Sequence, residues 1–248
     1  MIVDPFFYAL AVPAVVLLGL AKGGFSGMGA LSLPMLALAI DPVRAAAILL
    51  PILIVQDVVG IWAFRGTIDW RVIAWMLPGA GLGILLGYGF ASTVRPSAVL
   101  AVVGAISVAF GLWRLRIERR GMPVAARSPG WVGTLFGVAS GFTSQVAHAG
   151  QPPFQLWVLP RQLPRDVLVG TTALFFGAVN WLKVPAYLAL GQFTRANLLT
   201  SAALLPVAVA STVAGVWLVR RVSAHRFYTA IYVLMIAVGV KLVWDGVT

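Results

Sequence analysis

The residues best suited to chemistry lie in two short polar breaks within an otherwise apolar sequence. The first break, between Gly19 and Pro34, reads LAKGGFSGMGALSLP from its second residue, and the second, Gly137 to Pro153, reads GVASGFTSQVAHAGQPP. In both, Gly-Phe is followed by Ser or Thr and, some residues later, by proline. Backbone that leaves helical geometry inside a bilayer is tolerated only beside protein or a water-filled cavity. The breaks therefore predict a binding cavity.

The first break has the composition of an anion site. Lys22 would supply a fixed positive charge to the site, or else extend its ammonium group to a membrane interface. Ser26 or Gly27 can cap the helix that follows, which leaves free N–H groups and a positive dipole end facing the break. Glycine at positions 23 and 24 would let a ligand touch the backbone. The alternative is that Gly23, Gly24, Gly27 and Gly29 only allow helices to pack closely.

The second break carries a cluster of neutral donors and acceptors: Thr143, Ser144, Gln145, His148 and Gln151. Such groups can replace the water around a small anion. His148 is interpreted either as a proton carrier or as a neutral donor to an oxyanion, and the alternative is a capping or packing histidine. Pro152 and Pro153 fit the first turn of another short helix.

Four further polar residues interrupt longer apolar segments near their middle. Asp57 follows Gln56 in one segment, and Asn180 and Lys183 occupy the corresponding place in a later one. Ionisable groups inside a bilayer are costly and tend to mark function. Two readings stay open: an internal Asp57–Lys183 ion pair with hydrogen bonds between helices, or a role in binding substrate or a proton.

Composition assigns the chain to the membrane. Of its 248 residues 60% are hydrophobic and 10% charged, and the mean hydropathy is +0.97, which no soluble domain of this size would carry. The net charge of +11 is spread singly between apolar runs, a pattern of membrane topology rather than of nucleic-acid binding. Cysteine is absent, and Asp4 argues against a cleavable signal, so we expect the first apolar run to stay in the mature protein.

Ten apolar segments position these residues. The segments at 131–142 and 152–160 are well short of the roughly 20 residues that span a bilayer, and so predict a hairpin of short helices. By analogy the pair around the first break is expected to do the same. The ten segments are 5–21, 27–40, 45–64, 72–91, 97–113, 131–142, 152–160, 167–190, 197–219 and 227–244.

The order of long and short segments recurs in the two halves. Because each half has an odd number of crossings, the second must run inverted through the bilayer. We predict an all-α polytopic membrane protein of two inverted-topology repeats, each with a broken or re-entrant pair of short helices plus three spanning helices. The expected units are a first repeat at 1–117, a cytoplasmic linker at 118–130 and a second repeat at 131–248.

Positive charge orients the chain. With the arginine-rich segment Arg114 to Arg127 placed in the cytoplasm, most of the 18 lysines and arginines also lie inside. Arg44, Arg95 and Arg195 then lie outside with both termini. The expected location is the bacterial inner membrane, with the termini on its periplasmic side.

No motif of a soluble enzyme is present. The sequence lacks a Walker loop, HExxH, a dinucleotide-binding glycine fingerprint and a cysteine pair. A histidine and an aspartate in separate segments are too little for a hydrolase or a metal site. We therefore expect no enzyme, no catalytic residue, no bound metal and no cofactor.

Three stretches resemble a known family. GLAKGGFSGMGALSLPML, GVASGFTSQVAHAGQPPFQLW and the LGQF turn at 190–193 are similar to the TauE/SafE family of membrane permeases, over essentially the whole chain. The resemblance implies two related halves and export of sulfite and small organosulfonates from bacterial cells. The chain departs from the family in its second half, where HAGQPP replaces the usual run of glycines.

The predicted function is that of a secondary permease exporting a small sulfur oxyanion, sulfite or an organosulfonate such as sulfoacetate. The alternatives are a permease for a cation or neutral solute that uses Asp57, and a membrane structural or assembly subunit. Expected partners are the small anionic substrate and the lipid bilayer, not nucleic acid, and a homodimer is left open.

Overall fold

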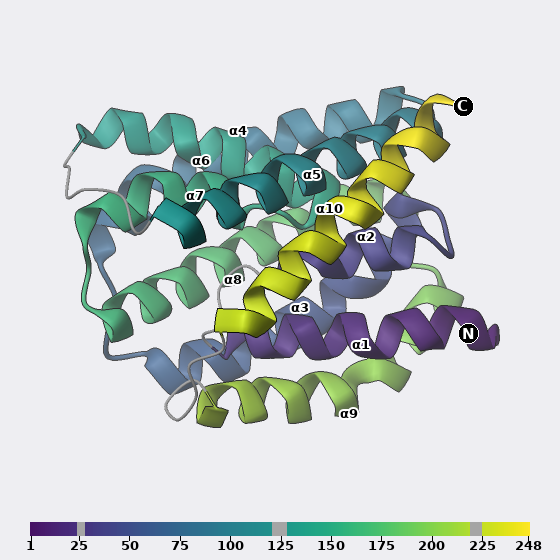
Figure 1. The fold of residues 1–248 in the computed structure, drawn as a ribbon, viewed down its shortest axis with the longest axis horizontal. Coiled ribbons are helices and arrows are strands. Elements are labelled where there is room, and N and C mark those ends of the chain that lie inside the picture. Colours follow the sequence, from purple (N-terminus) through teal and green to yellow (C-terminus); the bar gives the residue numbers. More distant parts are fainter. Residues whose placement is uncertain (24–27, 121–127, 219–224) are drawn as a thin grey trace.

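The protein is all-helical, as predicted. The structure, a computed structural model, describes residues 1–23, 28–120, 128–218 and 225–248, and within these ranges it contains no strand. In chain order the helices are α1 (Pro5–Lys22), η1 (Met28–Leu31), α2 (Ser32–Ala37), α3 (Pro42–Phe64), α4 (Trp70–Thr93), α5 (Pro96–Arg120), α6 (Gly130–Ala147), α7 (Gln151–Val158), η2 (Leu159–Arg161), α8 (Arg165–Ala189), α9 (Arg195–Leu218) and α10 (His225–Val247). Figure 1 shows most of them lying along one common direction.

Several helices are long and apolar enough to cross a membrane. In the part of the chain that the structure describes, 6 meet this description: α1, α3, α4, α5, α8 and α9. The chain is therefore a polytopic membrane protein. The helix α5 continues three residues into the expected linker, to Arg120, and the rest of that linker up to Arg127 lies outside the described residues.

Aspartate begins three of the helices. The Asp41 carboxylate accepts hydrogen bonds from the N–H groups of Val43 and Arg44 at 2.9 and 3.0 Å, and Pro42 fills a first-turn position that needs no donor. Asp4 and Asp69 cap α1 and α4 in the same way. Local capping therefore sets where these helices start.

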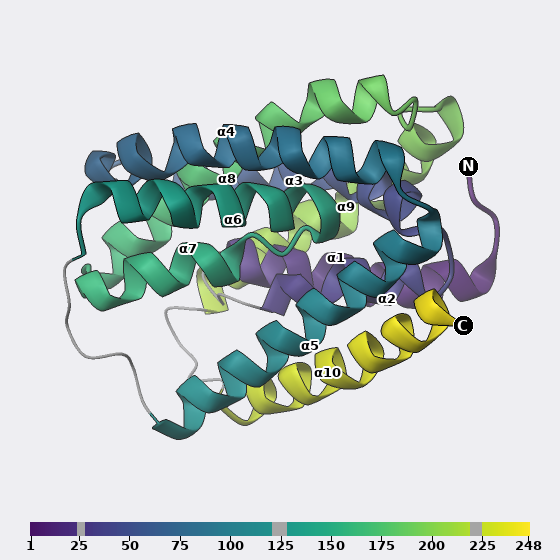
Figure 2. The ribbon, with the colours of Figure 1, turned by 90° about the horizontal axis from the view of Figure 1, so that it is seen from above.

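The first broken pair enters from the end of the molecule that carries the termini. The N–H of Ile2 donates to Thr200 Oγ1 (3.0 Å), so α1 and α9 start together at this end. Ser32 of α2 donates to the Ala14 carbonyl of α1 (2.8 Å), because the chain turns back after Lys22 and returns alongside α1. Both termini lie at this end in Figures 1 and 2.

The second broken pair enters from the opposite end. Thr134 near the start of α6 donates to the Trp75 carbonyl near the start of α4 (2.9 Å). Arg161, just after α7, donates to the Ser128 carbonyl just before α6 (3.1 Å), so the pair leaves where it entered. The two pairs thus approach the middle from opposite ends, the geometry that an inverted repeat requires, although the repeat itself stays a prediction.

The helix before the second break is longer than the sequence predicted. We expected a short segment at 131–142, but α6 has 18 residues and ends at Ala147. The polar residues do not end it, because the Thr143 hydroxyl donates to the Ala139 carbonyl of its own helix (2.8 Å). The helix stops one turn later, where His148 takes the left-handed conformation with φ 49°.

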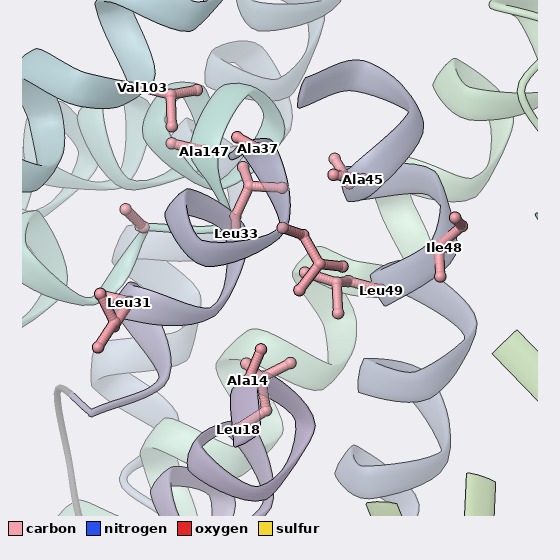
Figure 3. Close-up of a cluster of buried hydrophobic side chains, with 14 of the residues drawn as sticks. Ala14, Leu18, Leu31, Leu33, Ala37, Ala45, Ile48, Leu49, Val103 and Ala147 are labelled. Atoms are coloured by element: carbon pink, nitrogen blue, oxygen red, sulfur yellow. The ribbon is translucent and has the colours of Figure 1, made fainter. Parts of the chain in front are cut away.

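A buried apolar cluster surrounds the first broken pair. Figure 3 shows members of this cluster: Leu31 and Leu33 from the first broken pair, Leu18 of α1, Leu49 of α3 and Ala147 from the tip of α6. These four leucines are at most 4% exposed. On the outer flank, α5 and α10 lie side by side (Figure 2) and pack against α2 and η1. The core therefore holds the first break against the end of the second.

Glycines bring α4 and α6 into backbone contact. A Cβ added at Gly141 would clash with the Ala80 carbonyl oxygen, whereas one added at Gly81 would meet no atom within 4 Å. We expect Gly141→Ala to lower the stability by about 1–3 kcal/mol, because a rigid backbone must move, and Gly81→Ala to leave it unchanged. Thermal unfolding in detergent measures both. Equal melting temperatures for the two variants would contradict this packing.

Arginine side chains lie at both ends of the molecule. Arg44 bonds Asn197 at the end of the termini, whereas Arg161 and Arg165 lie at the other end. Which end faces the cytoplasm stays a prediction, and the cysteine-free chain allows a clean test. An impermeant thiol reagent added to intact cells should label Ser97→Cys and spare Ser128→Cys. The reverse labelling pattern would invert the predicted orientation.

Candidate functional site

A small cavity lies between the two breaks. Its volume is about 50 Å³, and its wall combines both halves of the chain. Six of the residues predicted to form the site line it: Lys22, Ser144, His148, Gln151, Asn180 and Lys183. Apolar side chains, mainly from the first half, complete the wall: Leu18, Ala21, Ala30, Leu53 and Phe176, together with the backbone of Gly29. We refer to this space as the central cavity.

The predicted ion pair of Asp57 with Lys183 is wrong. Asp57 instead pairs with Lys22 through Oδ1 and accepts a hydrogen bond from Asn180 Nδ2 at Oδ2 (2.5 Å). Asn180 and Lys183 share a face of α8, but Asn180 lies level with Asp57 and occupies its second oxygen. Lys183 lies nearly one turn further along α8, where it meets α6. Lys22 therefore does not provide an uncompensated positive charge.

Lys183 forms a separate network with the second break. Its ammonium group donates to the carbonyl and the hydroxyl oxygen of Ser144 (3.3 and 3.2 Å) and lies 2.7 Å from His148 Nδ1. The side chain is 0% exposed. These contacts provide hydrogen-bond acceptors for the ammonium group, but none of the acceptors is a carboxylate. A buried cation without a counter-ion is costly, so its position on a cavity wall indicates a function.

The hydrogen bonds of His148 define its tautomer. Nε2 lies 2.9 Å from the Ala46 carbonyl of α3, which can only accept, so Nε2 carries the proton. Nδ1 then accepts from Lys183, and the ring is neutral. The ring stacks on Tyr187, with centroids 6.4 Å apart. His148 therefore ties the second break to α3 and α8 and contributes no positive charge.

Other predicted residues lie away from the central cavity. Gly23 packs on the backbone of Gly215, which is the close-packing role left open above. Thr143 bonds its own helix, and Gln56 donates to the carbonyls of Val15 and Ala208 at 3.4 Å. Gln145 is 2% exposed and its amide has no partner among the described residues, yet it does not line the cavity. The predicted site residues Gly24, Ser26 and Gly27 lie outside the described residues.

Two contributors were missed. The ring of Phe176 lines the cavity and lies 5.7 Å from the Lys22 ammonium, a cation–π distance. Its apolar type gave no signal in the sequence, although it lies one helical turn before Asn180 on the same face of α8. The Ala46 carbonyl could not be predicted for a different reason, because every residue has a backbone acceptor and the sequence does not indicate which one is used.

The expectation that no metal is bound stays a prediction. In the described ranges, no three His, Asp or Glu residues gather in a way that could hold a metal ion. The cavity wall instead offers ammonium, hydroxyl and amide groups over an apolar floor. Such a set can bind and release a small polar ligand.

Comparison with known proteins identifies the chain's relatives. The family model described as "Sulfite exporter TauE/SafE" matches residues 11–242, nearly the whole chain. Searches of curated proteins and of solved structures found no match. The match includes both breaks and every described residue of the cavity wall. The chain therefore belongs to the TauE/SafE family of membrane transporters.

Proposed function

We propose that the protein is a secondary permease that exports a small sulfur oxyanion, sulfite or an organosulfonate, across the bacterial inner membrane. The ligand would bind in the central cavity, between the two breaks. The observation that carries this proposal is Lys183, a fully buried ammonium group on the cavity wall whose hydrogen-bond partners are all neutral. A bound anion would supply the missing negative charge.

Neutral groups around the cavity suit the rest of an oxyanion. The Ser144 hydroxyl and the amides of Asn180 and Gln151 lie in the same wall as Lys183. Such groups can donate to the oxygen atoms of the ligand and replace part of its water shell. The apolar floor from Leu18, Leu53 and Phe176 would accept the carbon end of a sulfonate.

Cavity size favours a small ligand. A volume of about 50 Å³ by this measure holds roughly three to five water molecules. Sulfite or methanesulfonate needs no more room than that. A longer sulfonate such as sulfoacetate would require the two breaks to move apart.

The rival proposals receive less support. A cation bound by Asp57 would have to displace both Lys22 and Asn180, which occupy its two carboxylate oxygens. A purely structural role would not explain why the charge of Lys183 is buried without a counter-ion. The family match also favours transport.

Ligand-induced thermal stabilisation tests the proposal. The purified protein should melt several degrees higher with sulfite or methanesulfonate, because a ligand that binds only the folded state stabilises it. Glycine and tetramethylammonium chloride provide a zwitterion and a cation with as many heavy atoms as methanesulfonate. Stabilisation by tetramethylammonium but not by either anion would overturn the proposal.

A further inference from the structure

We propose that the central cavity selects anions that carry one negative charge, such as an alkanesulfonate or hydrogen sulfite, over anions that carry two, such as sulfate. This inference rests on the proposed function and narrows its substrate class. It follows from the charges around the cavity rather than from its size.

The charges around the cavity leave one positive charge uncompensated. Among the described residues of the wall, Lys22 and Lys183 are the ones with a formal charge, and Asp57 behind the wall pairs with Lys22. The histidine of the wall is neutral, because Nε2 donates to the Ala46 carbonyl and Nδ1 accepts from Lys183. Residues 24–27, at the first break, are Gly-Phe-Ser-Gly and add no charge. With Lys183 protonated, the sum is one positive charge.

A single negative charge on the ligand would complete this balance. Burying a second one would leave an uncompensated anion among Leu18, Leu53 and Phe176, where the low dielectric makes unpaired charge expensive. The Lys22–Asp57 pair cannot supply a second positive charge without losing its own partner. Because Asp57 neutralises Lys22, the cavity favours a ligand with a single negative charge.

Methanesulfonate and sulfate provide a matched test, because both are tetrahedral and differ mainly in one charge. Calorimetry on the purified protein should give binding of methanesulfonate at least about tenfold tighter than that of sulfate. Asp57→Asn raises the charge of the site by one and should shift the ratio toward sulfate by about tenfold or more. The double variant Lys22→Gln/Asp57→Asn restores the original charge and should restore the original preference.

If Asp57→Asn folds poorly, the double variant can still be measured, because it removes both charges of the Lys22–Asp57 pair and leaves neither one unpaired. Equal affinities for the two anions in the unmodified protein would overturn the inference and leave the proposed function standing. A double variant that prefers sulfate would overturn it as well. Failure to bind either anion would instead contradict the proposed function.

An independent observation supports a second inference. A smaller cavity of about 20 Å³ lies beside the central one and shares Ala21, Lys22, Gln151 and Phe176 with it. Its remaining lining, Val169, Thr172 and Ala173, continues the same face of α8 toward Arg165. We infer that the ligand travels along this face and that the Phe176 ring closes the passage between the two cavities.

Burial of the α8 face supports this path. Val169 and Thr172 are half-buried, whereas Ala173 is 6%, Phe176 7% and Asn180 2% exposed, so the exposed fraction falls between Thr172 and Phe176. Lys22, on the boundary, retains 15% of its side-chain exposure. The central cavity is thus approached from the Arg165 end.

Cysteine accessibility tests this gate in the cysteine-free chain. A small thiol reagent should modify Thr172→Cys at least about tenfold faster than Ser144→Cys, which lies beyond the ring. Adding Phe176→Ala should accelerate Ser144→Cys without changing Thr172→Cys. Phe175→Ala removes a buried ring from the same aromatic cluster but from neither cavity wall, so it controls for loosened packing. Equal acceleration by Phe175→Ala, or none by Phe176→Ala, would overturn the gate.

Discussion

Asp57→Asn should lower the free energy of unfolding by about 3–5 kcal/mol, because it leaves the Lys22 ammonium without its counter-ion. Lys22→Gln should cost a similar amount by leaving the 2%-exposed Asp57 carboxylate unpaired. The double variant should lose less than the sum of the two. A double-mutant cycle on thermal or denaturant unfolding measures this coupling.

Lys183→Gln provides the matched comparison for that cycle. Lys183 does not pair with Asp57, so Asp57→Asn and Lys183→Gln should be closer to additive than Asp57→Asn and Lys22→Gln. Residues one turn apart still share a network through α8, so a small coupling is expected. Stronger coupling of Asp57 to Lys183 than to Lys22 would contradict the observed pairing.

Lys183→Gln should abolish anion binding while leaving the ligand-free protein at least as stable. The amide can still donate to Ser144, and the variant removes a buried charge that has no counter-ion. The lost attraction to a bound anion is roughly 3 kcal/mol, more than a hundredfold in affinity. Calorimetric titration with methanesulfonate and a melting curve without ligand measure the two effects.

Lys241→Gln controls for the loss of a lysine as such. Lys241 is 60% exposed, pairs with Asp245 on the surface of α10 and does not line the central cavity. It should leave both anion affinity and stability nearly unchanged. A Lys183→Gln variant that is strongly destabilised yet binds anion normally would show that Lys183 is structural.

Much of the fold could be predicted because it depends on local composition. Apolar length predicted where the long helices lie, and the structure shows that aspartates before Pro5, Pro42 and Trp70 set where three of them begin. The end of α6 was wrong because hydroxyl groups were taken as helix breakers. Within a buried helix they bond the carbonyl one turn back, as Thr143 does.

The sequence predicted which polar residues form the site, but not the ion pair and hydrogen bonds between them. Polar residues that are costly at membrane depth can be picked from a sequence, and six of them meet in one cavity. Which lysine pairs with Asp57 depends on the relative depth of α1 and α8, which side-chain packing decides. Phe176 and the Ala46 carbonyl gave no signal, because neither residue type stands out in an apolar sequence.

The central claim is that a small anion crosses the membrane by binding beside Lys183. Release of labelled sulfite from reconstituted vesicles tests it most directly, with the unmodified protein, Lys183→Gln and Lys241→Gln compared at equal protein content. We predict rapid release for the unmodified protein and for Lys241→Gln, and release no faster than from protein-free vesicles for Lys183→Gln. Undiminished release through Lys183→Gln would contradict the claim.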